Sequence, residues 1–197
     1  MGRDRAARPE AKPLRLFVAV DLPGHAEDLI ERAVAPWKDR LPQGRWVARR
    51  KWHVTLKFLG RTFPRLVGAV EDACRQAAAA AAPFDMALDG LGVFPGRTRA
   101  RVFWVGLDDP SGGMTALAAD LDDRLAADFP PEKRAFTPHL TVARFNPPIP
   151  FHEHAEDVAR AELRSDPFPM DRLLLYRSHL SPKGAEYEPV GEYELGR

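Results

Sequence analysis

Two stretches of this chain, HVTLKF (53–58) and HLTVARF (139–145), each open on a histidine that is followed two residues later by a threonine. Both stretches are typical of β-strands, in which successive side chains point to opposite faces. The histidine and threonine of each stretch therefore share one face, and the apolar residues between them share the other. Such a chain must fold into a sheet that holds two half-buried strands, each with an imidazole and a hydroxyl on its open side.

The predicted elements around the two stretches follow the same order: strand, helix, H-x-T strand, helix, strand and strand. Phe17, in the first strand of one set, lies 36 residues before His53, and Phe103, in the first strand of the other, lies 36 residues before His139. This agreement predicts an α+β fold of two pseudo-symmetric lobes, built by an internal duplication, with the two H-x-T strands facing each other across a groove. Apolar spacing predicts helices over 24–37, 64–82, 114–125 and 152–165, and strands over 14–20, 53–58, 84–91, 101–107, 139–145, 168–176 and about 186–195.

Length and composition exclude several classes of protein. The 197 residues suffice for two small lobes that share a core, and no apolar run approaches the ~18 residues that a membrane span needs. The N-terminus lacks the apolar stretch of a signal peptide, and the single cysteine, Cys74, excludes an internal disulfide and is interpreted as a packing residue. We therefore expect a monomeric cytoplasmic protein with no membrane partner, made of a flexible basic arm (1–13) and one two-lobed domain (14–197). The formal net charge of +1 does not indicate an extended basic surface of the kind that binds long nucleic acid, so an anion site must be local.

Five segments carry a resemblance to a known family: LRLFVAVDLP, GRWV with WHVTLKFLG, RVFWVGL, FTPHLTVARF and DRLLLYRSHLSPKGAEYEPV. They resemble the RNA 2',3'-cyclic phosphodiesterase family, also called the 2'-5' RNA ligase family, within the two-histidine (2H) phosphoesterases. The resemblance runs from about Leu14 to the C-terminus, which is nearly the whole chain. It implies two similar α+β lobes, each with an antiparallel sheet and two helices, joined across a central active-site groove.

The paired H-x-T motifs suit the opening of a cyclic phosphate, which needs a proton taken from water and another given to a ribose oxygen. Two imidazoles, one neutral and one protonated, can do both, because the ordinary histidine pKa of ~6.5 leaves both forms available near neutral pH. We expect His53 and His139 to be catalytic, with no metal and no other cofactor. Thr55 and Thr141 are expected to donate hydrogen bonds to the non-bridging oxygens. The resemblance implies that His53 protonates the leaving 3' oxygen and that His139 activates water, so that the product is a 2'-phosphate.

Other side chains are candidates for binding the substrate. Strict alternation puts Lys57 on the open face with the first histidine and threonine. The same alternation puts Arg144 on the core face, so we expect its strand to end there and its side chain to turn to the cleft. The resemblance favours Arg144 as a phosphate or ribose contact, and a solvated surface arginine is the alternative. Phe17 and Phe58 are candidates for stacking a base, although strand phenylalanines are more often core residues.

Two further charged groups have open interpretations. Arg97, Arg99 and Arg101 lie in or beside a Pro-Gly loop, where they either guide an RNA backbone or only keep the loop solvated. The sequence His152-Glu153-His154 suggests a metal clamp, but residues two apart do not share a helix face, so we expect no metal there.

Several functions fit this site. The first is a phosphodiesterase acting on RNA ends or nucleotides with a 2',3'-cyclic phosphate, and the second is ATP-independent 2'-5' ligation, in which the same site joins the cyclic phosphate to a 5'-hydroxyl. A related two-histidine enzyme for a cyclic nucleotide or for ADP-ribose cyclic phosphate is a third. A non-catalytic module that binds RNA ends is the alternative from another class, and it would not need two titratable groups.

Overall fold

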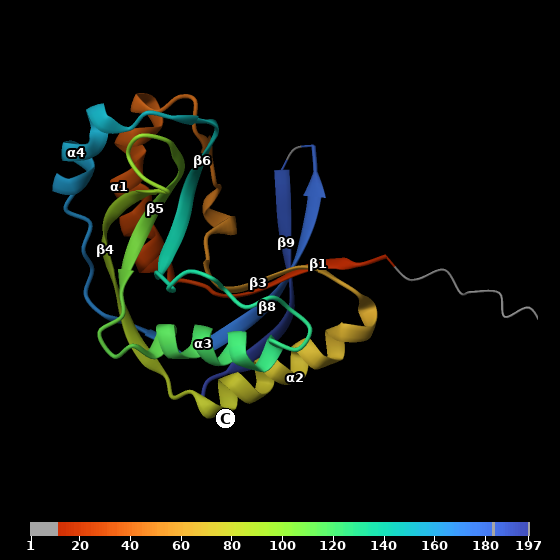
Figure 1. The fold of residues 1–197 in the computed structure, drawn as a ribbon. Helices are drawn as coiled ribbons and strands as arrows, with labels where there is room; N and C mark the ends of the chain where they lie inside the picture. The colour runs from red at the N-terminus through yellow and green to blue at the C-terminus, as the bar shows by residue number, and fades with distance from the viewer. Residues whose placement is uncertain (1–11, 183, 197) are drawn as a thin grey trace, which may run out of the picture.

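The computed structural model describes residues 12–182 and 184–196, so that most of the predicted arm lies outside the described residues. Four α-helices and nine strands in these ranges form an α+β fold around one curled antiparallel sheet (Figure 1). The α+β class expected from the sequence is confirmed. The strands are β1 (Leu14–Val20), β2 (Arg45–Trp46), β3 (Val54–Thr62), β4 (Phe84–Phe94), β5 (Ala100–Asp108), β6 (His139–Ile149), β7 (Phe168–Met170), β8 (Arg172–Ser181) and β9 (Gly184–Glu194). The helices are α1 (Gly24–Arg40), α2 (Pro64–Ala80), α3 (Gly113–Leu125) and α4 (Ala155–Arg160), with 3-10 turns η1 (Arg49–Lys51) and η2 (His152–His154).

The sheet has a narrow waist. Its strand order is β7-β4-β5-β6-β3-β1-β8-β9, with β2 paired to β6, and β3 meets β6 at a single residue pair, Val54 and Leu140. The waist divides the sheet into a β1 half (β3, β1, β8 and β9) and a β5 half (β7, β4, β5, β6 and β2). Neither half is a continuous stretch of chain, because β8 and β9 join β1, while β2, which precedes β3 in the chain, joins β6.

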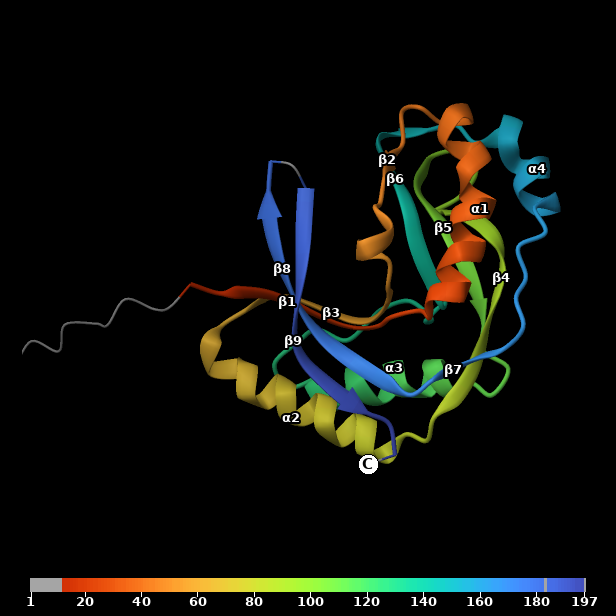
Figure 2. The ribbon, with the colours of Figure 1, turned by 180° about the vertical axis from the view of Figure 1, so that it is seen from behind.

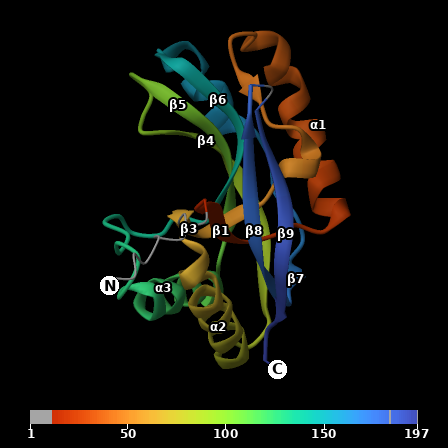
Figure 3. The same cartoon turned by 90° about the vertical axis from the view of Figure 1, so that its right-hand side faces the viewer.

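Helices α1 and α3 each pack on the half of the sheet opposite to that of the strand they follow. Helix α1, which follows β1, packs on the β5 half, where Trp37 meets Phe103 edge to face at 5.6 Å. Helix α3, which follows β5, packs on β3 and beside α2, and α2 covers β8 and β9. The view from behind shows α1 and α4 along the β5 half, and the side view shows α2 and α3 together beneath the β1 half (Figures 2 and 3). Each half of the sheet thus has two helices on one face, which leaves its other face for the site.

The helices follow their apolar periodicity. The buried residues of α1 recur every three or four positions, at Ala26, Ile30, Val34 and Trp37, which is the spacing of one helix face. Cys74 is fully buried in α2 as a free thiol, which confirms its interpretation as a packing residue, and burial raises the pKa of its thiol to about 12. Within the described ranges no helix is both long enough and apolar enough to cross a membrane.

The helix predicted over 152–165 is shorter than expected. It consists of η2 and α4 and ends at Arg160. Beyond it the chain runs extended beside β4, where the Leu163 carbonyl accepts a hydrogen bond from the Gly90 N–H at 2.8 Å and Arg164 bridges to Asp89. Burial of the Leu163 side chain against the core therefore outweighs the helical propensity of the alanine-rich segment before it.

Candidate active site

The two H-x-T motifs meet at the waist of the sheet. Val54 and Leu140, the pair that joins β3 to β6, lie inside their motifs and are both fully buried. The histidine before and the threonine after each of them are half-buried on the opposite face. Because the pairing is antiparallel, His53 lies on the Thr141 side and Thr55 on the His139 side. Two imidazoles and two hydroxyls are thus gathered at one place from residues far apart in the chain.

Both imidazoles are held in the same way by the backbone two residues earlier. The Nδ1 of His53 lies 2.9 Å from the Lys51 carbonyl oxygen, and the Nδ1 of His139 lies 2.7 Å from the Thr137 carbonyl oxygen. A carbonyl can only accept, so each Nδ1 carries the proton and donates it. The Nε2 atom of each ring is then the one that can take up or give a proton in a reaction.

Aromatic rings fix each imidazole in place. The His53 ring lies 4.8 Å from the Phe17 ring and 5.1 Å from the Tyr187 ring, and the His139 ring lies 5.0 Å edge-on to Phe94. Burial lowers the pKa of His53 to about 4, with a further contribution from the charge of Arg144 and an opposing one from the Lys51 carbonyl. The pKa of His139 is lowered for the same two reasons, against the Thr137 carbonyl. Both imidazoles are therefore neutral at pH 7 in the free protein, and an anion is needed to favour the protonated form of one of them.

Arg144 reaches the histidine face through a β-bulge. Opposite β5, Trp104 pairs with Thr141 and Phe103 with Ala143, so that Val142 is an extra residue in β6. Val142 and Ala143 are both fully buried, and the alternation resumes with Arg144 on the open face. The strand was expected to end at Arg144, but it runs on to Ile149. The Arg144 charge lowers the pKa of both histidines, which indicates that the guanidinium lies near both.

The expected position of Lys57 is wrong. A matching bulge in β3 leaves Leu56 without a partner between the pairs Thr55–Ala19 and Lys57–Val18. Leu56 and Lys57 therefore both point to the core side, and the Lys57 side chain is only 1% exposed. Its ammonium group pairs with Asp122 of α3 and donates to the Pro130 carbonyl oxygen at 2.8 Å, away from the histidines.

Phe17 supports His53 and does not offer a surface to a ligand. Its side chain is 3% exposed, and its ring stacks on Tyr176 at 5.3 Å while also touching the imidazole. Base stacking would need an open ring face, so the expectation of a substrate contact is wrong for Phe17. Four further aromatic residues surround the imidazoles from other strands and could not be predicted, because they belong to no short motif: Tyr176, Tyr187, Phe94 and Trp104.

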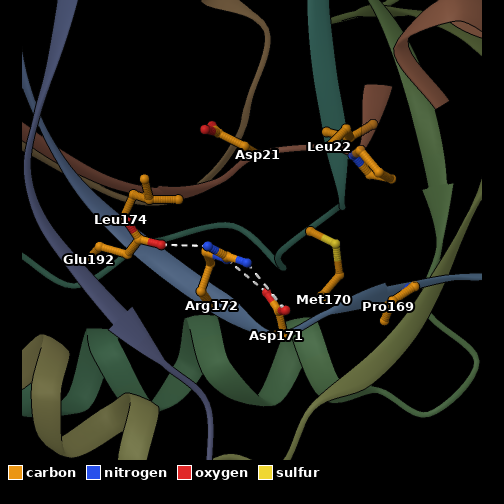
Figure 4. Close-up of a pocket in the computed structure, with 9 residues that line it drawn as sticks. Asp21, Leu22, Pro169, Met170, Asp171, Arg172, Leu174 and Glu192 are labelled. Carbon is orange, nitrogen blue, oxygen red and sulfur yellow. Dashed lines mark hydrogen bonds and ion pairs between the residues drawn. The ribbon is translucent and has the colours of Figure 1, made fainter. Parts of the chain in front are cut away.

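A pocket of about 460 Å³ opens where β1 ends and β8 begins, and it contains none of the H-x-T residues. Figure 4 shows Arg172 in this pocket bound to both Asp171 and Glu192, at 2.8 and 2.6 Å. With Asp21 added, the lining holds three carboxyl groups and one guanidinium. This acidic lining is unsuited to a phosphate, so the candidate active site is placed at the waist, where the H-x-T residues lie.

The segment His152–His154 lies away from the waist, on the β5 half. The His154 ring packs edge-on against Phe151 at 5.4 Å and Trp37 at 6.1 Å. In the part of the chain that the structure describes, no three histidine, cysteine, aspartate or glutamate side chains are grouped so as to hold a metal ion.

Comparison with known proteins identifies the family. Residues 25–182 match the family model of the 2'-5' RNA ligase superfamily. The chain belongs to this superfamily. A relative from Methanothermobacter thermautotrophicus named RNA 2',3'-cyclic phosphodiesterase is 30% identical over 184 residues, which cover 92% of this chain and 99% of that protein. A relative of the same name from Geobacillus stearothermophilus is 33% identical over 181 residues, 91% of this chain, and the chain spans 56% of its length.

Solved structures share the fold. A protein from Thermus thermophilus superposes with a TM-score of 0.74 at 27% identity, over 93% of this chain and 98% of that one. Escherichia coli LigT without ligand superposes with a TM-score of 0.71 at 26% identity, over 95% of this chain and 100% of that one. The curated relatives are named phosphodiesterases, and this superfamily member is an enzyme of the same class, a phosphoric diester hydrolase. The resemblance found in the sequence is confirmed.

Proposed function

We propose that this protein is an RNA 2',3'-cyclic phosphodiesterase that opens cyclic phosphate ends to 2'-phosphates by acid/base catalysis with His53 and His139, without a metal or other cofactor. The observation that carries the proposal is the meeting of the two H-x-T motifs at the waist, with both Nδ1 atoms tied to backbone carbonyls. Two reactive Nε2 atoms at one place can serve the entering and the leaving oxygen of an in-line displacement. A module that only binds RNA ends would not require this arrangement.

In the proposed reaction the Nε2 of His139 takes a proton from water as its oxygen bonds to phosphorus. The bond from phosphorus to the 3' oxygen breaks, and that oxygen receives the proton from the Nε2 of His53. One turnover thus moves a proton from His53 to His139 and leaves a 2'-phosphate and a 3'-hydroxyl. The assignment of acid and base follows the family resemblance, because the two motifs are alike in geometry.

The negative charge of the substrate favours the protonated histidine that the free site lacks. Burial and Arg144 lower the pKa of both histidines, and an anion between the two rings acts in the opposite sense. We infer that His53 takes up its proton together with the cyclic phosphate. Thr55, Thr141 and Arg144 then donate to the non-bridging oxygens, where negative charge grows in the transition state.

The decisive experiment follows the phosphorus atom. Adenosine 2',3'-cyclic phosphate and a dinucleotide with the same end are incubated with the protein, with and without EDTA, and the products are followed by phosphorus NMR. Turnover to the 2'-phosphate, unchanged by EDTA, is expected. A 3'-phosphate product would reverse the roles of the two histidines, and activity that is lost in EDTA and restored by a metal would contradict the proposed chemistry.

The same site could also act as an ATP-independent 2'-5' ligase, by opening the cyclic phosphate with a 5'-hydroxyl, and the name of the superfamily favours this second activity. The incoming 5'-hydroxyl would replace water, with the proton transfers unchanged. Competition with bulk water favours hydrolysis, so we expect ligation only when an RNA with a 5'-hydroxyl is present in excess. Adding such an RNA to the assay and looking for a 2'-5' linked product tests this.

We also propose that residues 14–197 form one domain that arose by internal duplication and that acts as a monomer in the cytoplasm. Support for the duplication comes from the 86 residues that separate His53 from His139 and from the bulges that follow the two motifs at equivalent positions, Leu56 and Val142. The carbonyl two residues before each histidine repeats as well.

A further inference from the structure

The turn that supplies the backbone acceptor for His53 is held from two sides. The carbonyl of Lys51, which accepts the hydrogen bond from Nδ1 of His53, lies at the end of η1. Arg49 begins this turn and is bound to α1, with its Nε atom 2.9 Å from the carboxylate of Glu27. Lys51 is bound to β9, with its ammonium group 2.6 Å from the carboxylate of Glu186. The turn is thus tied to a helix on one half of the sheet and to a strand of the other.

The same strand also holds the imidazole ring itself. Glu186 belongs to the β8–β9 hairpin, which rises beside η1 (Figure 2). The next residue, Tyr187, packs edge-on against the ring of His53, with 5.1 Å between the ring centres, and lies 5.1 Å from the ring of Phe17. Two consecutive residues of β9 therefore contact the catalytic ring and the turn that carries its backbone acceptor.

The ion pair between Lys51 and Glu186 is better suited to positioning than to stabilising the fold. The Lys51 side chain is only 15% exposed, but that of Glu186 is 55% exposed. Arg50 also reaches this carboxylate, at 3.2 Å. A pair that water can reach contributes little to stability, because water screens the attraction and both side chains lose freedom. Its main effect is then on the place of Lys51, whose backbone oxygen binds the catalytic ring directly.

The acceptor for His139 is held in another way. Next to Thr137, the Pro138 carbonyl accepts a hydrogen bond from the Leu107 N–H at 3.2 Å, so backbone pairing with β5 fixes this segment. The backbone N–H of Lys51, in contrast, bonds to the Ala48 carbonyl within the turn. The place of the His53 acceptor therefore depends on side chains, and the ion pair to β9 distinguishes the two histidines.

We propose that Glu186 and Tyr187 are positioning residues for His53. Glu186 acts through Lys51 on the carbonyl that binds Nδ1, and Tyr187 acts on the plane of the ring. The inference rests on the proposed function, in which Nε2 of His53 delivers a proton to the leaving oxygen. A neutral imidazole can carry its proton on either nitrogen. Releasing the turn should let the second tautomer form and should displace Nε2 from the leaving oxygen.

The kinetic test uses adenosine 2',3'-cyclic phosphate. Glu186→Ala should lower kcat by about 10- to 100-fold with KM little changed, since a displacement of ~1 Å at a reacting group can cost about 10²-fold. Lys51→Met should give the same loss, and the double variant no larger one, because each change removes the same contact. Glu188→Ala is the matched control, because this neighbouring carboxylate of β9 pairs with His179 instead, at 2.8 Å.

The ring of Tyr187 is tested by a conservative pair of variants. Tyr187→Phe keeps the edge-on contact and should keep the wild-type kcat. Tyr187→Leu removes the contact and should lose activity to about the same extent as Glu186→Ala.

Nitrogen-15 NMR of the imidazoles at pH 7 gives a measurement that does not depend on turnover. It identifies which ring nitrogen carries the proton. The wild-type protein should show both His53 and His139 protonated at Nδ1. Glu186→Ala should add the form protonated at Nε2 for His53 alone, with His139 as the internal reference.

Three results would overturn the inference. A loss in Lys51→Met without a loss in Glu186→Ala would mean that Lys51 binds the substrate directly. An unchanged His53 tautomer in Glu186→Ala would show that the ion pair does not hold the ring, and equal changes at His53 and His139 would indicate a general loosening of the fold. If the wild-type protein has no turnover, the proposed function fails, and the NMR result alone decides whether Glu186 positions His53.

Discussion

The ammonium group of Lys57 is bound to the carboxylate of Asp122, and the pair ties the strand that carries His53 to helix α3. Asp122 also accepts a hydrogen bond from the Glu132 N–H at 3.1 Å, and Lys57 donates to the Pro130 carbonyl. The tethered segment leads from α3 into Thr137 and β6. This buried ion pair therefore fixes the start of the segment that connects α3 to β6, and so helps to position His139 beside His53.

Removing the carboxylate should destabilise the protein strongly. Asp122→Ala would leave the Lys57 ammonium buried without a counter-charge, which typically costs about 3–5 kcal/mol of unfolding free energy. Lys57→Met should cost less, since it leaves behind only a carboxylate that is itself partly exposed. Urea unfolding measures both. Asp72→Ala, which breaks an exposed pair with Arg75 on α2, is the control, and an Asp122→Ala protein as stable as this control would contradict the assignment.

Each histidine should be needed for turnover but not for folding. His53→Asn and His139→Asn keep an N–H that can reach the same backbone carbonyl, but they cannot transfer a proton at Nε2. We expect each to lower kcat by about 10²–10⁴-fold, the usual worth of a general acid or base. Circular dichroism should show an unchanged fold. Near-normal turnover by either variant would rule out that histidine as acid or base.

The two threonine hydroxyls should contribute to rate in a graded way. A single donor to a developing oxyanion is worth up to about 10²–10³ in kcat. Thr55→Val and Thr141→Val should each lose less than this, because Arg144 shares the charge. Single-turnover rates at saturating substrate measure the effect. Unchanged rates in both variants would show that the hydroxyls do not contact the reacting phosphate.

Arg144→Met should change both the pKa values and the rate. Because the Arg144 charge lowers the pKa of His53 and His139, its removal should raise both pKa values toward the ordinary range. Turnover should fall by roughly 10- to 150-fold, the worth of a hydrogen bond to a charged group. NMR titration of the imidazole signals separates the two effects, with Arg75→Met on the surface of α2 as the control. Unmoved titration curves would place the guanidinium away from the site.

The histidines should also make the fold sensitive to acid. Burial lowers the pKa of His53 to about 4, against about 6.5 in an unfolded chain, so the unfolded chain binds more protons between these values. The resulting stability is present above pH ~6.5 and is lost as the pH falls toward 4, and His139 contributes in the same direction. Unfolding free energies measured at pH 7, 6 and 5 should fall less steeply in His53→Asn than in the wild type. Parallel slopes would disprove this.

The reacting groups could be predicted from sequence because H-x-T on a strand is a local pattern, and local periodicity also located α1 and α2. The bulges could not be predicted. Leu56-Lys57 and Val142-Ala143 share no composition that distinguishes them from regular strand, yet each reverses the face of all that follows. This reversal is why the expected position of Lys57 was wrong and why Arg144 reaches the cleft without the strand ending.

The long-range pairing of the strands also could not be predicted from the sequence. The pairing of β8 with β1 joins strands from opposite ends of the described chain. Tyr176 and Tyr187 reach His53 only through this pairing, so no pattern near the histidine could reveal them. Long-range pairing is decided by the packing of the whole chain and not by the propensities of single segments.

The crossed arrangement of helices and strands means that neither half of the chain can complete a sheet half by itself. A chain that carried one repeat alone would have α1 and β4 with no β5 half to pack on. Two such chains could satisfy each other by exchanging this helix and this strand, which is a domain-swapped dimer with one histidine from each copy. Under the internal duplication proposed above, fusion would have joined two such exchanging partners into one polypeptide and allowed equivalent positions of the two motifs to differ, as Phe58 and Arg144 do.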